Sequence, residues 1–166
     1  MEEEEVLGDF RASKALLEGH FLLSSGRHSA YYLQCARVLM NPDRASRLAI
    51  ALAGKLPREL RKSINKVVSP AMGGVIIGHE MGRALEIDAL FVERPDGTFE
   101  FRRGFELDQG DRVLLVEDVV TTGKSSREAI DAIHKAGGIV VAAAALVDRS
   151  AGEVDLGVPF HPLIQI

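Results

Sequence analysis

Two adjacent acids, followed by a loop rich in glycine and hydroxyl groups, are the residues of this chain best suited to chemistry. Val113 to Val116 has the composition of a buried strand, so Glu117 and Asp118 should emerge at its carboxyl end, where open α/β sheets bind ligands. Two carboxylates can accept hydrogen bonds from neighbouring hydroxyls of a sugar. The residues from Thr121 to Ser125, called the phosphate loop below, then offer backbone N–H groups and hydroxyls to an anion at the start of a helix. The segment therefore predicts a site for a phosphorylated polyol.

The end of this loop also matches part of a nucleotide-binding P-loop, through Gly123, Lys124 and Ser125. The first glycine of that motif would fall at position 118, where the chain has Asp118, and an acid there would repel a polyphosphate wrapped around the loop. The sequence thus argues against a P-loop. An ordinary strand-to-helix turn with N-capping threonines is the purely structural alternative.

The bulk composition limits the class of protein. A chain of 166 residues fits one domain, 1–166, and can bury about 68 to 70% of its unfolded surface. Its net charge of −4 argues against a nucleic-acid-binding surface. No apolar run reaches the ~18 residues of a membrane span, no signal peptide is evident, and the single Cys35 cannot form an internal disulfide. We expect a cytoplasmic enzyme that binds neither membrane nor nucleic acid.

The elements that must position the site follow from hydrophobic periodicity and turn residues. The predicted strands are 30–34, 66–69, 89–93, 98–102, 113–116 and 139–147, and the predicted helices are 8–19, 42–56, 73–85 and 125–136. The first helix would bury Phe10, Leu16 and Leu17, and the acidic run from Glu2 to Glu5 is expected to be frayed and solvated. The alternation of strands and helices predicts an α/β fold with a parallel sheet.

Four ordered segments resemble those of the type I phosphoribosyltransferases, and their combination is similar to the bacterial and archaeal enzymes of that family that act on orotate. The segments are Glu117 to Ser125, Glu18 to Ser29, Pro70 to Gly74 and Ala145 to Ser150, so the resemblance covers about residues 8 to 164. It implies a mostly parallel central sheet flanked by helices, with a small N-terminal hood formed by about residues 1–40. It also implies the reaction of orotate with phosphoribosyl pyrophosphate (PRPP), giving orotidine 5′-monophosphate and pyrophosphate.

The resemblance implies a role for each matching residue. The acidic pair would hold the ribose hydroxyls and act in catalysis with Arg94, and PRPP would contact Glu117, Asp118, Val119, Val120, Thr121, Thr122, Gly123, Lys124, Ser125 and Arg94. Orotate would be bound by Thr121 and by Arg149, whose guanidinium suits a planar carboxylate. Further contacts are implied for Ser24, Arg27 and Tyr32 of the hood. They are also implied for Met72 and Gly73 of the pyrophosphate loop, Pro70 to Gly74, and for Arg102 and Arg103 of the lid. Mg²⁺ would be held mainly by PRPP, and the lid, from Arg94 to Phe105, would reach into the neighbouring site of a homodimer.

The chain departs from several relatives in ways that affect these roles. The lid carries arginines but no lysine or histidine, and arginine cannot act as a general acid near neutral pH, so we interpret the lid as electrostatic. Met72 and Gly73 stand where some relatives have a lysine, which leaves backbone N–H groups to face pyrophosphate. The alternatives are solvated hairpin charges for the lid arginines, core packing for Tyr32, and a surface pair with Asp148 for Arg149.

Two other functions stay open from the sequence. A phosphoribosyltransferase for another base would share the phosphate loop but has no evident use for Arg149 as a carboxylate ligand. A non-catalytic PRPP-binding regulator should carry a nucleic-acid-binding element, and the sequence shows no basic face or appended helix-turn-helix.

Overall fold

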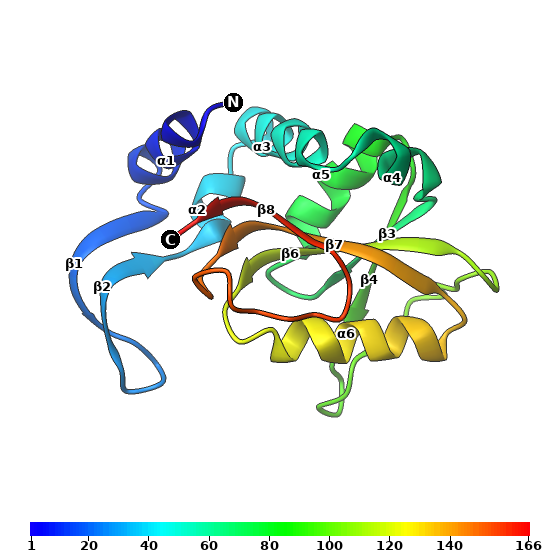
Figure 1. The fold of residues 1–166 in the computed structure, drawn as a ribbon. Coiled ribbons are helices and arrows are strands. Elements are labelled where there is room, and N and C mark those ends of the chain that lie inside the picture. The colour runs from blue at the N-terminus through cyan, green and yellow to red at the C-terminus, as the bar shows by residue number, and fades with distance from the viewer.

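The computed structural model describes residues 1–166 and is built on a six-stranded sheet with the order β5-β4-β3-β6-β7-β8 (Figure 1). Five strands are parallel, and the short β5 pairs antiparallel with β4. The strands are β3 (Lys66–Pro70), β4 (Asp88–Glu93), β5 (Glu100–Phe101), β6 (Arg112–Val120), β7 (Ile139–Asp148) and β8 (Phe160–Gln165). The predicted α/β fold with a mostly parallel sheet is therefore confirmed.

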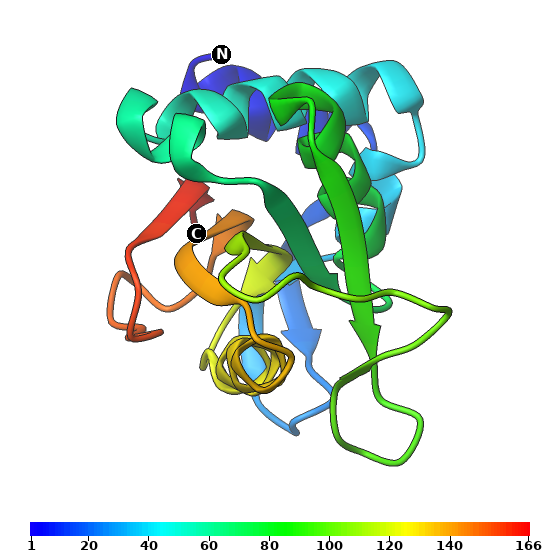
Figure 2. The same cartoon turned by 90° about the vertical axis from the view of Figure 1, so that its right-hand side faces the viewer.

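Helices cover both faces of the sheet, with α3 and α5 on one side and α6 on the other (Figures 1 and 2). The helices are α1 (Glu3–Ala12), α2 (Cys35–Leu39), α3 (Pro42–Lys55), α4 (Arg58–Ser63), α5 (Val75–Leu85) and α6 (Lys124–Lys135). No helix is long and apolar enough to cross a membrane.

The hydrophobic core is split by the sheet into two layers, and β6 contributes to both. Leu114 and Val116 belong to the larger cluster, beneath α3 and α5, whereas Val113 and Leu115 belong to the smaller cluster, beneath α6. Because side chains alternate between the faces of a strand, this pattern fixes which layer each later residue of β6 faces.

The N-terminal hood differs from the sequence prediction. A helix over 8–19 is wrong, because α1 ends at Ala12, Lys14 takes a left-handed φ of 58°, and the chain continues as β1 (Leu16–Leu22). This strand pairs antiparallel with β2 (His28–Leu33) in a separate two-stranded sheet beside the main one (Figure 1). Cross-strand pairing thus overrides the local helical pattern.

The buried residues of the predicted first helix are correct in part, because Phe10 and Leu16 are buried but Leu17 is 39% exposed. The acidic run is helical rather than frayed. The backbone N–H of Glu2 donates to Glu5 Oε2 at 3.0 Å, and acids are favoured in the first turn of a helix.

Candidate active site

The acidic pair lies inside β6, not beyond its end as the sequence predicts, because β6 stays paired with β7 as far as Val120. The alternation along β6 therefore separates the two neighbours. Asp118 lies on the side of α5, and Glu117 lies on the side of α6.

Asp118 is approached closely by the loop between β3 and α5. A Cβ atom built on Gly73 would lie 2.6 Å from Asp118 Oδ2, so a larger residue at position 73 would have to displace this carboxylate. Asp118 Oδ1 accepts a hydrogen bond from the backbone N–H of Val119 at 2.8 Å. Burial raises the pKa of Asp118. The predicted pyrophosphate loop and the predicted ribose ligand are thus in contact.

Glu117 is a buried acid with an unused hydrogen-bonding atom. Glu117 is only 7% exposed, and its Oε1 atom has no hydrogen-bond partner. Burial raises the pKa of Glu117 to about 8, Asp118 adds to this rise, and Ser126 and Arg94 oppose it. A buried polar atom without a partner is costly, so a ligand hydroxyl at this position would satisfy it.

The predicted phosphate loop surrounds a small hollow of about 60 Å³ next to Glu117. Gly123 has a φ of 80° and lies directly before α6, whose first turn supplies free N–H groups and the positive end of the helix dipole. The residues around the hollow are Glu117, Val119, Val120, Thr121, Thr122, Gly123, Lys124, Ser125 and Ser126. The structure therefore brings all the predicted loop residues together, although Val120 and Gly123 are buried and can offer only backbone groups.

A larger cavity of about 930 Å³ lies between the hood and this loop. It joins residues far apart in the sequence, since it is lined by Leu22, Leu23, Ser24, Ser25, Arg27, Tyr32, Leu33, Thr121, Thr122 and Arg149. The predicted hood residues and both predicted orotate ligands therefore meet at one cavity. Tyr32 is 41% exposed, which argues against simple core packing.

Arg149 points towards the hood. Its Nη2 donates to Ser29 Oγ at 3.2 Å, and no carboxylate pairs with it. The Asp148 carboxylate instead accepts a hydrogen bond from the backbone N–H of Ser150 at 2.8 Å. The surface-pair alternative for Arg149 is therefore wrong, and its guanidinium retains donors for a ligand.

The lid arginines are placed differently from one another. Arg94 donates to Ser125 Oγ of the phosphate loop at 3.4 Å, pairs with Glu128 of α6, and lies 4.0 Å from the ring centroid of Phe99. Its position beside the loop fits a role with an anion. Within this single chain, the lid arginine Arg94 is the one that reaches the site.

Arg102 and Arg103 are not brought to the acidic pair. Arg103 makes two hydrogen bonds of 2.9 Å to the Glu93 carboxylate, and this contact lowers the pKa of Glu93. Arg102 is exposed. Met72 is 86% exposed, and it does not line either of the two cavities described above.

Comparison with known proteins decides the family. Residues 42–157 match the phosphoribosyl transferase domain. The chain belongs to the phosphoribosyltransferase family. The resemblance carried by the four segments is therefore confirmed, and the sheet with its flanking helices is the type I phosphoribosyltransferase fold.

Several phosphoribosyltransferases are similar along the whole chain. The orotate phosphoribosyltransferase of Novosphingobium aromaticivorans is 76% identical over 166 residues, which are 100% of this chain and 86% of that protein. The orotate phosphoribosyltransferase of Erythrobacter litoralis is 72% identical with the same coverage. Among solved structures, orotate phosphoribosyltransferase from Aeropyrum pernix superposes with a TM-score of 0.77 at 28% identity, covering 96% of this chain and 93% of the other.

Four residues near this phosphoribosyltransferase site were missed by sequence reasoning. Ser126 lies against Glu117, Glu128 pairs with Arg94, Arg127 contacts the phosphate loop, and Ser29 accepts from Arg149. Of these four residues, Glu128 has a local sequence signal, because it follows Lys124 by four residues and so lies on the same face of the helix. The Nζ atom of Lys124 and the Oε1 atom of Glu128 lie 4.0 Å apart.

The residues present are compatible with a Mg²⁺ ion that arrives with its substrate. No group of three or more His, Cys, Asp or Glu side chains is placed to hold a metal ion. Two acids on opposite sides of β6 cannot supply a full set of ligands, so an ion here would take most of its ligands from phosphate oxygens.

Proposed function

We propose that this protein is an orotate phosphoribosyltransferase, which transfers the 5-phosphoribosyl group of PRPP to orotate in pyrimidine (UMP) synthesis. The observation that carries the proposal is one cavity, which is lined both by Arg149 and by Thr121 and Thr122 of the phosphate loop. The identity of 76% to an orotate phosphoribosyltransferase over the full chain supports it. We infer that residues 1–166 form one domain, and the cytoplasmic location stays a prediction.

The proposed reaction breaks the bond between C1′ of the ribose and pyrophosphate and forms a bond from C1′ to a ring nitrogen of orotate. That nitrogen loses its proton, so the products are orotidine 5′-monophosphate, pyrophosphate and a proton. Positive charge develops on the ribose while negative charge develops on the leaving group. The phosphate loop fixes the 5′-phosphate, and Glu117 and Asp118 orient the ribose hydroxyls close to the developing cation. Arg94 and the backbone around Gly73 face the departing pyrophosphate. Mg²⁺, when bound, neutralises part of the charge of the pyrophosphate group.

The proposed base specificity depends on Arg149. Its guanidinium can form two parallel hydrogen bonds to the carboxylate of orotate, in exchange for the weaker contact to Ser29. A base without a carboxylate would leave this guanidinium without that partner.

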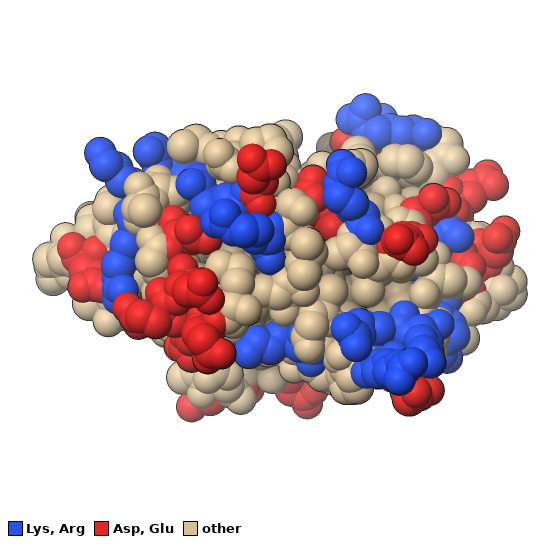
Figure 3. All heavy atoms as spheres, turned by 90° about the horizontal axis from the view of Figure 1, so that it is seen from above, with Lys and Arg blue, Asp and Glu red and all other residues tan.

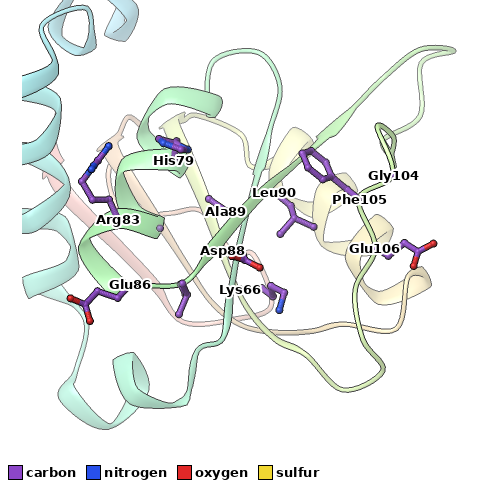
Figure 4. Close-up of a pocket in the computed structure, with 12 residues that line it drawn as sticks. Lys66, His79, Arg83, Glu86, Asp88, Ala89, Leu90, Gly104, Phe105 and Glu106 are labelled. Atoms are coloured by element: carbon purple, nitrogen blue, oxygen red, sulfur yellow. The ribbon is translucent and has the colours of Figure 1, made fainter.

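The proposed homodimer would cover the open face of α5 and β4. Two adjoining cavities of about 780 and 270 Å³ lie along this face, and Figure 4 shows His79 and Arg83 on one side of the larger cavity and Glu106 on the other. Ile76 of α5 is 46% exposed nearby. Because Gly104 and Phe105 of the lid line the larger cavity, a symmetrical second copy bound here would bring its own lid to this face. Ultracentrifugation tests this: wild type should be a dimer and Ile76→Glu a monomer, and a monomeric wild type would contradict it.

We infer that nucleic acid is not a partner of this protein. The net charge is −4, and Figure 3 shows acidic and basic side chains interspersed on the visible face rather than a continuous basic surface.

The direct test is to mix purified protein with PRPP, Mg²⁺ and orotate and to follow the ultraviolet absorption of orotate. Orotate should be consumed, and adenine, hypoxanthine and uracil in parallel reactions should not. Consumption of another base without consumption of orotate would refute the proposal.

A further inference from the structure

The phosphate loop is supported from behind by a second segment of chain. Gly123 has a left-handed φ, and a Cβ atom built on it would lie 2.6 Å from Val154 Cγ2 and 2.8 Å from Leu156 Cδ2. The same Cβ would lie 2.8 Å from Arg127 Nη1. The rear of the loop is therefore in close contact with the segment after β7 and with one arginine of α6.

Arg127 joins the phosphate loop to the segment after β7 through one nitrogen. Its Nη1 donates to the Thr122 carbonyl oxygen at 3.2 Å and to the Asp155 carbonyl oxygen at 3.1 Å. No carboxylate pairs with this guanidinium. Its hydrogen bonds are thus directed at backbone groups, one in the phosphate loop and one in the supporting segment.

The bond to Thr122 determines how the next peptide group is oriented. The C=O of Thr122 and the N–H of Gly123 belong to one planar peptide unit, and this unit is trans because the single cis bond of the chain is Ala71-Met72. In a trans unit the two groups point in opposite directions. Holding the carbonyl at the rear therefore turns the Gly123 N–H towards the hollow at the front, where an anion would accept from it.

The segment after β7, which supports the phosphate loop, begins at Arg149, the proposed ligand of orotate. The backbone N–H of Arg149 donates to the Val120 carbonyl oxygen at 2.8 Å, and the backbone N–H of Val154 donates to Ser150 Oγ at 3.1 Å. The segment is therefore fixed to β6 at its start, and Arg127 fixes it to the phosphate loop further along.

We propose that Arg127 is a positioning residue for PRPP, which holds the Thr122–Gly123 peptide in the orientation that binds the 5′-phosphate. This inference rests on the proposed function. Because the 5′-phosphate is bound alike in the ground state and the transition state, loss of Arg127 should raise the KM for PRPP and leave kcat nearly unchanged.

The test compares Arg127→Met, which keeps the length and removes the donors, with Arg127→Lys, which keeps a donor and the charge. Lys135→Met, an exposed change on the same helix, is the matched control. Arg127→Met should raise the KM for PRPP about tenfold, the factor that corresponds to about 1.4 kcal/mol, and Arg127→Lys should recover part of this loss. Calorimetric titration of PRPP without orotate should show the same change in affinity, whereas kcat and the KM for orotate should change less than about twofold.

An unchanged PRPP affinity in Arg127→Met would overturn the inference. So would a loss shared equally by kcat, both KM values and the melting temperature, because it would show a general structural effect. If Arg127→Met does not fold, Arg127→Gln replaces it in the same comparison. Wild-type protein that binds no PRPP would instead refute the proposed function, so the two failures are distinguishable.

Discussion

The buried carboxyl of Glu117 should make the stability of this protein fall as the pH rises. Its pKa is raised from 4.5 to about 8 in the folded chain, chiefly by burial. Between these two values the unfolded chain has lost the proton and the folded chain retains it. Stability must therefore decline with pH in this window, with a slope of about 1.4 kcal/mol per pH unit.

The size of the effect follows from the same two values. Below pH 4.5 the carboxyl is protonated in both states and has no pH-dependent effect, and its contribution is lost as the pH rises through about 8. The free energy of unfolding should fall by ~5 kcal/mol across the window on account of this residue. Glu117→Gln keeps the shape and removes the titration, so its stability should lack this part of the decline.

The assay is urea unfolding of the wild type and of Glu117→Gln at several pH values from about 5 to about 9. The quantity to plot is the difference between the two free energies of unfolding, because contributions from other groups, such as the raised pKa of Asp118, largely cancel. Glu100→Gln, an exposed change on β5, is the matched control. Parallel pH profiles for the wild type and Glu117→Gln would refute the reasoning that burial keeps this carboxyl protonated.

Three further substitutions test the site. Arg149→Ala should weaken orotate binding by about 100-fold, equivalent to about 3 kcal/mol for a charged pair of hydrogen bonds, and equal losses for orotate and PRPP in titration calorimetry would contradict its assignment. Asp118→Asn should lower kcat/KM for PRPP whichever base is offered, and steady-state assays in which only orotate use suffers would disprove this. Gly73→Ala places a Cβ 2.6 Å from Asp118 Oδ2, so the carboxylate must move and kcat/KM for PRPP should fall, and a fully active variant would show that the contact is unimportant.

The centre of the fold and the position of a glycine-containing loop before α6 could be predicted because their signals are local. The apolar run before Glu117, the glycine at position 123 and the amphipathic face of α6 each occur within a few residues. The helix predicted over 8–19 failed because its fate depends on a partner strand further along the chain, β2, which no local pattern specifies.

The geometry of the site was less predictable for the same reason. The end of β6 depends on pairing with β7, so the positions of the acids within the strand were missed. Arg94 and Glu128, which are in contact, lie 34 residues apart in the sequence. Arg149 and Ser29, which are also in contact, lie 120 residues apart. Such pairs follow from the folded topology and have no signature in the order of residues.

The placement of neighbouring acids in opposite layers of the molecule has a consequence for how this enzyme can be tuned. A change in packing beneath α6 alters the surroundings of Glu117, and a change beneath α5 alters those of Asp118, while the strand itself separates the two environments. Substitutions that never touch the substrate can therefore change the burial of one carboxyl at a time, although the charge of Asp118 also raises the pKa of Glu117. Engineering the pH range of sugar binding should begin with the apolar residues of one layer at a time.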